Sequence, residues 1–262
     1  MVGNLFLIAL AASTLGQASD PSPHSDLALS LAAVDPGKSV TIAATITLEP
    51  KWHCYWVNPG DNGTPTMLTF RSPLGWKHIQ TTWATPHRLD SQGMTAFGYE
   101  DKAVALITFS VAPSLAKKPA SLTVDGNWLV CQEACVPASQ SSSVSISAES
   151  MQTKRVLNAQ LVGLFPVPDH GKIVTSAARA GEDHVLRVSR IGGLDETSFQ
   201  FFPDAPGLTD HGAPVAKETA TGWELVLKKS PYADKAPRVI SGILTFRADR
   251  MEKAYKIYQV VR

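Results

Sequence analysis

Two of the three cysteines in this 262-residue chain, Cys131 and Cys135, are separated by only three residues. In an extended strand their Cα atoms would lie roughly 13 Å apart, at about 3.3 Å per residue, whereas a disulfide needs a separation below about 7 Å. The pair can therefore bond only if residues 132–134 form a tight turn or one helical turn. A bridge that closes so small a ring is expected to be strained and easily reduced, which favours redox chemistry over a structural role.

Thiol–disulfide exchange needs one accessible thiolate and a neighbouring thiol that resolves the mixed disulfide. Cys131 and Cys135 meet that need, and Glu133 between them is a candidate proton acceptor, although its charge would raise the pKa of a thiol. A static local disulfide, in a domain that serves interaction and not redox transfer, is the alternative. Nearby aromatic residues are expected to shield the sulfurs or, equally, to belong to the core; they are Trp128, Phe97 and Tyr99.

A Cu(I) site is the main alternative to redox chemistry. The soft or borderline ligands that it would use are Cys131, Cys135, Cys54, His53 and Met94. The sequence has no second cysteine pair and no paired-histidine spacing, so no cofactor is the first expectation and copper the second. His170, His184 and His211 are scattered and are expected to lie in solvated loops.

The third cysteine, Cys54, makes the cysteine count odd, which indicates an unpaired or intermolecular thiol in an exported protein. In a strand it would share a face with Trp52 and Trp56. We expect a small buried residue among these aromatics and Tyr55, with an intermolecular disulfide as the alternative.

Alternating apolar residues and frequent Gly and Pro turns predict an all-β protein of two immunoglobulin-like sandwiches. Ser39–Leu48 alternates clearly, and similar runs recur to the end of the chain. The expected divisions are a first domain with the cysteine pair over 19–149, a linker over 150–171 and a second β domain over 172–262. Apolar residues at helical spacing predict one short helix over Ser150–Phe165, ended by Pro166 and Pro168.

Residues 1–18 carry no charged side chain and contain a compact apolar run, which predicts a secretory signal peptide cleaved near Ala18. No other run approaches the length of a membrane span. The formal net charge of +1 gives no electrostatic reason to expect nucleic acid or an anionic membrane as a partner.

Four motifs, taken in order, resemble a known family: residues 51–61, Gly63-Thr64-Pro65-Thr66, Phe97-Gly98-Tyr99-Glu100 and residues 128–137. They are similar to the periplasmic N-terminal region of the DsbD-like and ScsB-like protein-disulfide reductases, also called the disulfide bond corrector family. The specific motifs all lie in the first half of the chain. The second half matches loosely, through Phe201-Phe202-Pro203 and the strand that contains Gly242.

The resemblance implies a pair of immunoglobulin-like domains in the periplasm that take electrons from a transmembrane thiol transporter. These electrons would pass through Cys131 and Cys135 to periplasmic thioredoxin-like or disulfide-containing proteins. The sequence contains neither membrane spans nor a thioredoxin-like domain, so the membrane partner is expected to be encoded separately. Cys54 departs from the family pattern, which has a non-cysteine residue between the positions of His53 and Tyr55.

Overall fold

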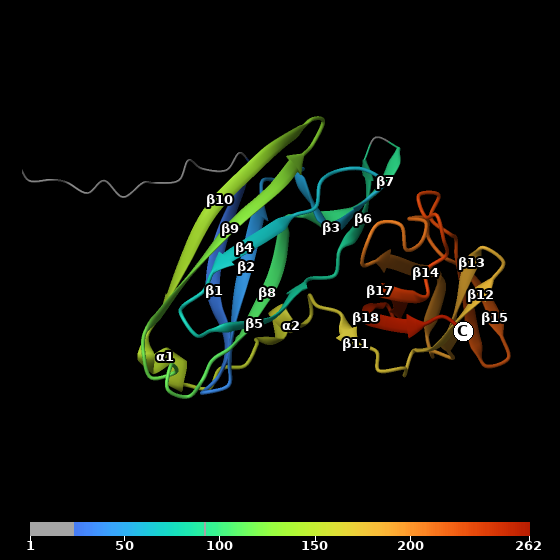
Figure 1. Ribbon diagram of the computed structural model, residues 1–262. Coiled ribbons are helices and arrows are strands. Elements are labelled where there is room, and N and C mark those ends of the chain that lie inside the picture. Colours follow the sequence, from blue (N-terminus) through green and yellow to red (C-terminus); the bar gives the residue numbers. More distant parts are fainter. Residues whose placement is uncertain (1–23, 92) are drawn as a thin grey trace, which may run out of the picture.

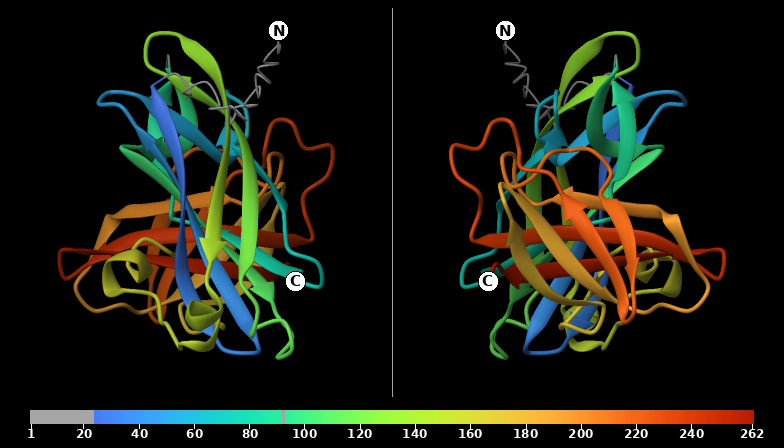
Figure 2. Two further views of the ribbon diagram at one scale, coloured as in Figure 1. Left: turned by 90° about the vertical axis from the view of Figure 1, so that its left-hand side faces the viewer. Right: turned by 90° about the vertical axis from the view of Figure 1, so that its right-hand side faces the viewer.

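The computed structural model of the chain describes residues 24–91 and 93–262. In this part of the chain the strands form four sheets, which make two β domains side by side (Figure 1). Figure 2 views the molecule from the first domain and from the second domain. The expected all-β, two-domain immunoglobulin-like architecture is confirmed. The expected signal peptide over residues 1–18 lies outside the described residues.

The first domain is a sandwich of two sheets. One sheet has the order β1-β2-β8-β5, from β1 (Ser25–Asp35), β2 (Ser39–Leu48), β8 (Lys102–Ser110) and β5 (Lys77–Trp83). The other has the order β10-β9-β3-β7-β6, from β10 (Cys135–Ile146), β9 (Ala120–Cys131), β3 (His53–Gly60), β7 (Met94–Glu100) and β6 (His87–Ser91), and β4 (Met67–Arg71) also pairs with β9. All three cysteines lie in this second sheet.

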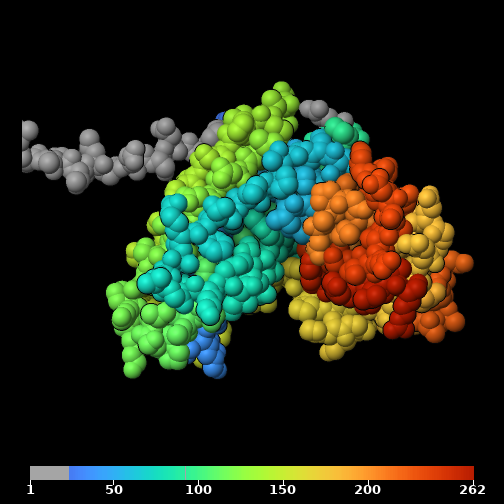
Figure 3. All heavy atoms as spheres, viewed as in Figure 1, coloured from blue at the N-terminus to red at the C-terminus, as the bar shows by residue number. Residues whose placement is uncertain are grey.

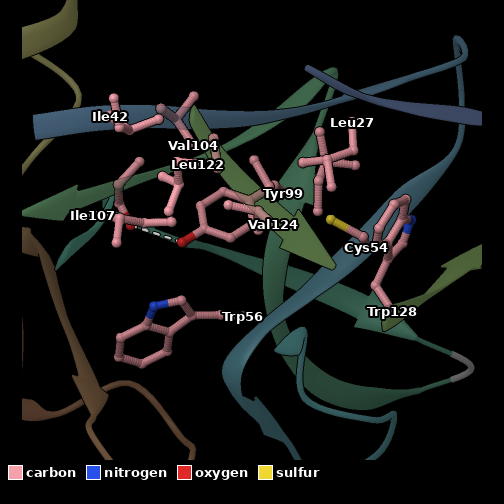
Figure 4. Packing of buried hydrophobic residues seen from close by; sticks show 14 of the residues in the cluster. Leu27, Ile42, Cys54, Trp56, Tyr99, Val104, Ile107, Leu122, Val124 and Trp128 are labelled. Atoms are coloured by element: carbon pink, nitrogen blue, oxygen red, sulfur yellow. Dashed lines mark hydrogen bonds between the residues drawn. The ribbon is translucent and has the colours of Figure 1, made fainter. Parts of the chain in front are cut away.

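The core of the first domain follows from the alternation of its strands. In β2, Val40, Ile42 and Ile46 are buried, while the intervening threonines lie nearer to solvent. Figure 4 shows Ile42 and Ile107 from one sheet facing Leu122 and Val124 from the other. This packing fixes which face of β3 and β9 points into the sandwich and which face points outward.

The segment after the first domain forms two short helices, α1 (Ala148–Gln152) and α2 (Ala159–Val162), so the predicted single helix over Ser150–Phe165 is wrong. Thr153 leaves the helical conformation, and Arg155 pairs with Val34 of β1 through two backbone hydrogen bonds of 2.9 and 3.0 Å. Asn158 then begins α2 by accepting the backbone N–H of Leu161 at 2.7 Å. Pairing to the first domain therefore overrides the helical spacing.

The second domain is also made of two sheets. The order of one is β11-β18-β17-β14, from β11 (Val167–Pro168), β18 (Met251–Val260), β17 (Val239–Ala248) and β14 (Leu194–Pro203). The order of the other is β12-β13-β16-β15, from β12 (Val174–Ala180), β13 (Asp183–Ser189), β16 (Gly222–Leu227) and β15 (Val215–Thr219). Its own core contains Leu186, Leu225, Leu244 and Phe246.

Two histidines of the second domain are buried, and the expectation that they lie in solvated loops is wrong. His184 is 0% exposed in β13 and its Nε2 lies 3.1 Å from the carbonyl oxygen of Pro237. His211 is 3% exposed, and its Nδ1 lies 2.7 Å from Asp61 Oδ1 of the first domain. Each imidazole finds a polar partner that sequence spacing does not reveal.

The two domains meet through a packed junction rather than through the linker alone. Phe97 of β7 packs edge to face on Phe202 of β14, with ring centroids 5.2 Å apart. The side-chain amide of Asn58 donates a hydrogen bond of 2.8 Å to the carbonyl of Pro203. In Figure 3 the second domain, in orange and red, lies directly against the first.

No helix within residues 24–91 and 93–262 is long and apolar enough to cross a membrane.

Candidate functional site

The Cys131–Cys135 disulfide closes the turn between β9 and β10. The two residues face each other as the last pair of this hairpin, with Cα atoms 4.1 Å apart. The turn of residues 132–134 contains a backbone hydrogen bond of 3.2 Å from Gln132 N–H to the Ala134 carbonyl. The β9–β10 turn lies at the opposite end of the first domain from α1 (Figure 1). The tight turn that the spacing requires is therefore present.

The two bonded cysteines differ in exposure. Cys131 is 2% exposed and packs in a small apolar cluster with Tyr55 and Ala96, on the outer side of the β3–β9 pair. Cys135 begins the edge strand β10 and is exposed. Of the two bonded residues, Cys135 is therefore the one more open to a thiolate that approaches from solvent.

Four residues with polar or sulfur-containing side chains lie in a row across four adjacent strands. Glu100 of β7 faces His53 of β3, which faces Cys131 of β9, which faces Cys135 of β10. Residues directly opposite in antiparallel strands point to the same face, with Cβ atoms about 4.5–5.5 Å apart. The row brings together three of the motifs that the sequence shows far apart, around His53, Glu100 and Cys131.

His53 is the ionisable group nearest to the buried sulfur along this row. Burial lowers its pKa from the ordinary value, and the carboxylate of Glu100 opposes that shift. Its Nε2 is buried and has no hydrogen-bond partner among the described residues. Its ring stands edge-on to Tyr55, with centroids 5.5 Å apart. The imidazole is thus mostly neutral at pH 7 and retains one free ring nitrogen.

Tyr55 is a site residue that the sequence did not single out, because it stood among the aromatics expected around Cys54. Its hydroxyl lies 3.7 Å from the sulfur of Cys135. Thr66 donates a side-chain hydrogen bond to the Tyr55 carbonyl. A Cβ on Gly63 would come within 2.4 Å of the Tyr55 ring, so the loop after β3 lies closely against it. Strand alternation is the available signal, since Tyr55 and His53 share one face of β3.

The structure places the expected shielding residues elsewhere. Phe97 is 0% exposed in the domain junction, and Tyr99 is 2% exposed in the sandwich core, where its hydroxyl donates a hydrogen bond of 2.8 Å to the Ala84 carbonyl. Trp128 is also a core residue, and its Nε1–H bonds the hydroxyl of Ser25 at 3.1 Å. Glu133 is exposed in the turn. The core interpretation of the three aromatics is therefore the right one.

Cys54 is unpaired and completely buried, as expected of a small core residue. Figure 4 shows its sulfur beside Leu27 and Trp128, on the inner face of β3 and away from the Cys131 face. Tyr55, by contrast, points to the opposite face. Burial raises the pKa of the Cys54 thiol to about 12. The thiol is therefore protonated at physiological pH.

The five ligands expected for copper do not all come together, since only His53, Cys131 and Cys135 are neighbours in the sheet. Cys131 and Cys135 are bonded to each other, and Cys54 points to the other side of the sheet. Met94 begins β7, whereas Glu100, the partner of His53, ends it. Among the described residues no group of three or more His, Cys, Asp or Glu side chains is arranged to hold a metal ion.

The first domain matches a known protein family, and the whole chain is similar to a solved structure. Residues 23–145 match the family described as thiol:disulfide interchange protein DsbD, N-terminal. The crystal structure of the N-terminal periplasmic domain of ScsB from Proteus mirabilis is similar over 90% of this chain and 92% of that chain, with a TM-score of 0.59 and 16% sequence identity.

A second solved structure is the DsbD N-terminal domain from Neisseria meningitidis in the reduced form. It is 14% identical and covers 45% of this chain and 81% of that chain, with a TM-score of 0.29. The curated proteins contain no match. The expected resemblance is confirmed: residues 23–145 match the DsbD N-terminal family, and the chain as a whole has the fold of the ScsB N-terminal periplasmic domain.

Proposed function

We propose that the protein is a periplasmic thiol–disulfide exchange protein. It carries electrons between a transmembrane thiol transporter and periplasmic thioredoxin-like or disulfide-containing proteins through Cys131 and Cys135. The observation that carries the proposal is a disulfide between one exposed and one buried cysteine at the end of an edge hairpin. The match of residues 23–145 to the DsbD N-terminal family supports the same chemistry.

The geometry gives an order of bond changes. A thiolate of a dithiol donor attacks the Cys135 sulfur, the Cys131–Cys135 bond breaks, and Cys131 leaves as a thiolate that takes a proton. The second thiol of the donor, as a thiolate, then attacks the donor sulfur in the mixed disulfide. Cys135 leaves as a thiolate, and the donor is oxidised to a disulfide.

Delivery of the electrons is the same sequence in reverse. The Cys135 thiolate attacks a disulfide of the client protein and forms a mixed disulfide with one of its sulfurs. Cys131, four residues away in sequence and directly opposite across the hairpin, then attacks Cys135 as a thiolate and releases the client as a dithiol. The client gains two electrons, and the Cys131–Cys135 disulfide returns.

Trapping of mixed disulfides tests this assignment of roles. Cys131→Ser leaves the exposed Cys135 thiol without its resolving partner, so a disulfide-linked partner should accumulate in cells and be identified by mass spectrometry. Of the bonded pair, Cys135→Ser leaves the buried Cys131 thiol, and this variant should trap far less partner. Cys54→Ala in each background is the control and should change neither result.

Two results together would refute the proposal. One is a Cys131→Ser protein that traps no partner in the cell. The other is an oxidised wild-type protein that a thioredoxin-like dithiol protein does not reduce in solution. If Cys135→Ser traps more partner than Cys131→Ser, exchange occurs but the roles of the two sulfurs are reversed.

A further inference from the structure

The exchange reaction leaves a chemical problem at Cys131. When the disulfide opens, this sulfur becomes a thiolate at a position only 2% exposed to solvent. Burial in apolar surroundings disfavours a thiolate and raises the pKa of its thiol. Its neighbours in the small cluster are the Tyr55 ring, whose hydroxyl lies at Cys135, and Ala96. A buried leaving group of this kind needs a proton donor or a hydrogen-bond donor beside it.

The row across the strands supplies such a group. His53 lies directly opposite Cys131, and the two strands pair only here and at the adjacent Cys54–Val130 pair. On its other side His53 faces Glu100. The resulting order of carboxylate, imidazole and sulfur follows the arrangement in which a base activates a thiol and a third group orients the base. Nε2 of His53 is buried and engaged by no other described group, so this ring atom is not already committed to another partner.

We propose that His53 is the proton donor and acceptor for the Cys131 sulfur, and that Glu100 positions and stabilises the imidazole. The inference rests on the proposed exchange function and names a residue that it requires. When Cys131 leaves, its thiolate takes a proton through His53, which recovers one from solvent. When Cys131 attacks to resolve a mixed disulfide, its proton passes to His53, so the proton balance closes in both directions.

The charged and titratable groups around His53 define its environment. Glu100 faces it from β7 and Cys131 faces it from β9, while Tyr55 lies beside it on its own face of β3. Glu133 is exposed in the turn beyond Cys131. The described partners therefore place a negative charge on one side of the imidazole and a sulfur on the other. This arrangement favours an imidazolium–thiolate pair once the disulfide is reduced.

A thiol titration tests the pairing directly. In Cys135→Ser the remaining thiols are Cys131 and Cys54, and Cys54, with its pKa of about 12, is silent at neutral pH. The thiolate absorbance between about pH 5 and pH 9 then reports Cys131 alone. Adding His53→Gln should raise the pKa of Cys131 by at least about one unit, which is roughly a tenfold loss of thiolate at pH 7.

The matched control is His78→Gln in the same Cys135→Ser background. His78 is an exposed histidine in the other sheet, bonded to the Thr81 hydroxyl at 3.0 Å, and its loss should leave the titration of Cys131 unchanged. Equal Cys131 titrations in the His53→Gln and His78→Gln proteins would overturn the proposal. Wild-type exchange activity would still stand in that case, so the two claims fail separately.

A second measurement needs no variant and holds if His53→Gln does not fold. NMR titration of the His53 ring in the wild-type protein should give a higher pKa in the reduced state than in the oxidised state, because only the reduced state has a thiolate beside it. A His53 titration that is the same in both redox states would contradict the coupling.

Discussion

The hydroxyl of Tyr55 and the ring of His53 are the polar groups that the outer face of β3 directs toward the disulfide. The Tyr55 hydroxyl lies 3.7 Å from the Cys135 sulfur, and His53 is paired across the strands with buried Cys131. Each sulfur thus has its own polar neighbour, although both neighbours come from one strand. This division fits the proposed roles, in which Cys135 meets the partner and Cys131 resolves the mixed disulfide.

Removal of the Tyr55 hydroxyl should act on Cys135. In Tyr55→Phe the thiolate loses a hydrogen-bond donor worth about 1 kcal/mol, so alkylation of reduced Cys135 at neutral pH should slow roughly fivefold. The measurement is the alkylation rate of the reduced protein, with Tyr232→Phe as a control because Tyr232 is 75% exposed. An unchanged rate in Tyr55→Phe would show that the hydroxyl has no influence on the thiolate.

At the scale of elements, the loop between β3 and β4 supports the site from the side. Gly63 has a φ of +94° and leaves no room for a Cβ against the Tyr55 ring. Gly93 has a φ of +79° but has nothing within 4 Å of a built Cβ. The two glycines therefore share the backbone requirement and differ in the contact.

Gly63→Ala should shift Tyr55 and slow thiol exchange, whereas Gly93→Ala should not. Both variants carry about 1 kcal/mol of backbone strain, so their melting temperatures should fall to a similar degree for that reason. The measurement is the rate at which dithiothreitol reduces the disulfide in each protein. Equal rates in the two variants would exclude a supporting role for the loop.

The sequence predicted those elements whose pattern is local. The alternation of Ser39–Leu48 gave β2 with its correct bounds, and the short cysteine spacing predicted a turn that the hairpin provides. The single helix over Ser150–Phe165 was wrong because Arg155 pairs with Val34, which lies far away in sequence. Likewise, the row of His53, Glu100 and Cys131 depends on register between distant strands, which no local pattern contains.

The dependence on contacts between distant segments also explains why the positions predicted for some aromatic and histidine residues were wrong. Phe97 belongs to the same sequence motif as Glu100, but its side chain lies on the other face of β7 and packs on Phe202 of the second domain. His211 is buried by its contact with Asp61, 150 residues away. The residue type suggests that such side chains could have a role, but only the tertiary structure shows which face of a strand or domain they occupy.

At the scale of the whole molecule, the domain junction joins two cores. Phe202 and Ile243 of the second domain belong to the core cluster of the first, and the buried Arg88 guanidinium lies over the Phe97 ring at 5.3 Å while donating to the His211 carbonyl. Burial lowers the pKa of Arg88, and Asp210 and Asp61 oppose that shift. The two domains are therefore expected to stabilise each other.

Phe202→Ala should destabilise both domains, at a cost of about 3–5 kcal/mol. Phe199→Ala is the matched control, because Phe199 packs only in the second core. Amide hydrogen exchange, measured as the temperature is raised, should show reduced protection of the β7 backbone amides in Phe202→Ala and not in Phe199→Ala. Loss of protection confined to the second domain in both variants would show that the domains are energetically independent.

Stability should fall as pH decreases, because the unfolded chain takes up protons on half-buried His53 and buried His184 more readily than the folded chain does. Burial lowers the pKa of both His53 and His184 below 6.5, so the unfolded chain binds more protons in this range than the folded one. The stability is complete above about pH 6.5 and is lost progressively as the pH falls through the lowered pKa values. Denaturant unfolding at pH 5 and pH 7 measures the loss, and His184→Gln should make it smaller. A loss of the same size in wild type and His184→Gln would remove His184 from this account.

The reduction potential of the Cys131–Cys135 pair tests the central claim most directly. Equilibration of the purified protein with redox buffers of known potential, followed by thiol alkylation and mass spectrometry, gives this value. An exchange disulfide should have a potential near or above that of thioredoxin, about −270 mV, so that a thioredoxin-like donor reduces it. A potential below about −300 mV would mark the bridge as structural and contradict the account.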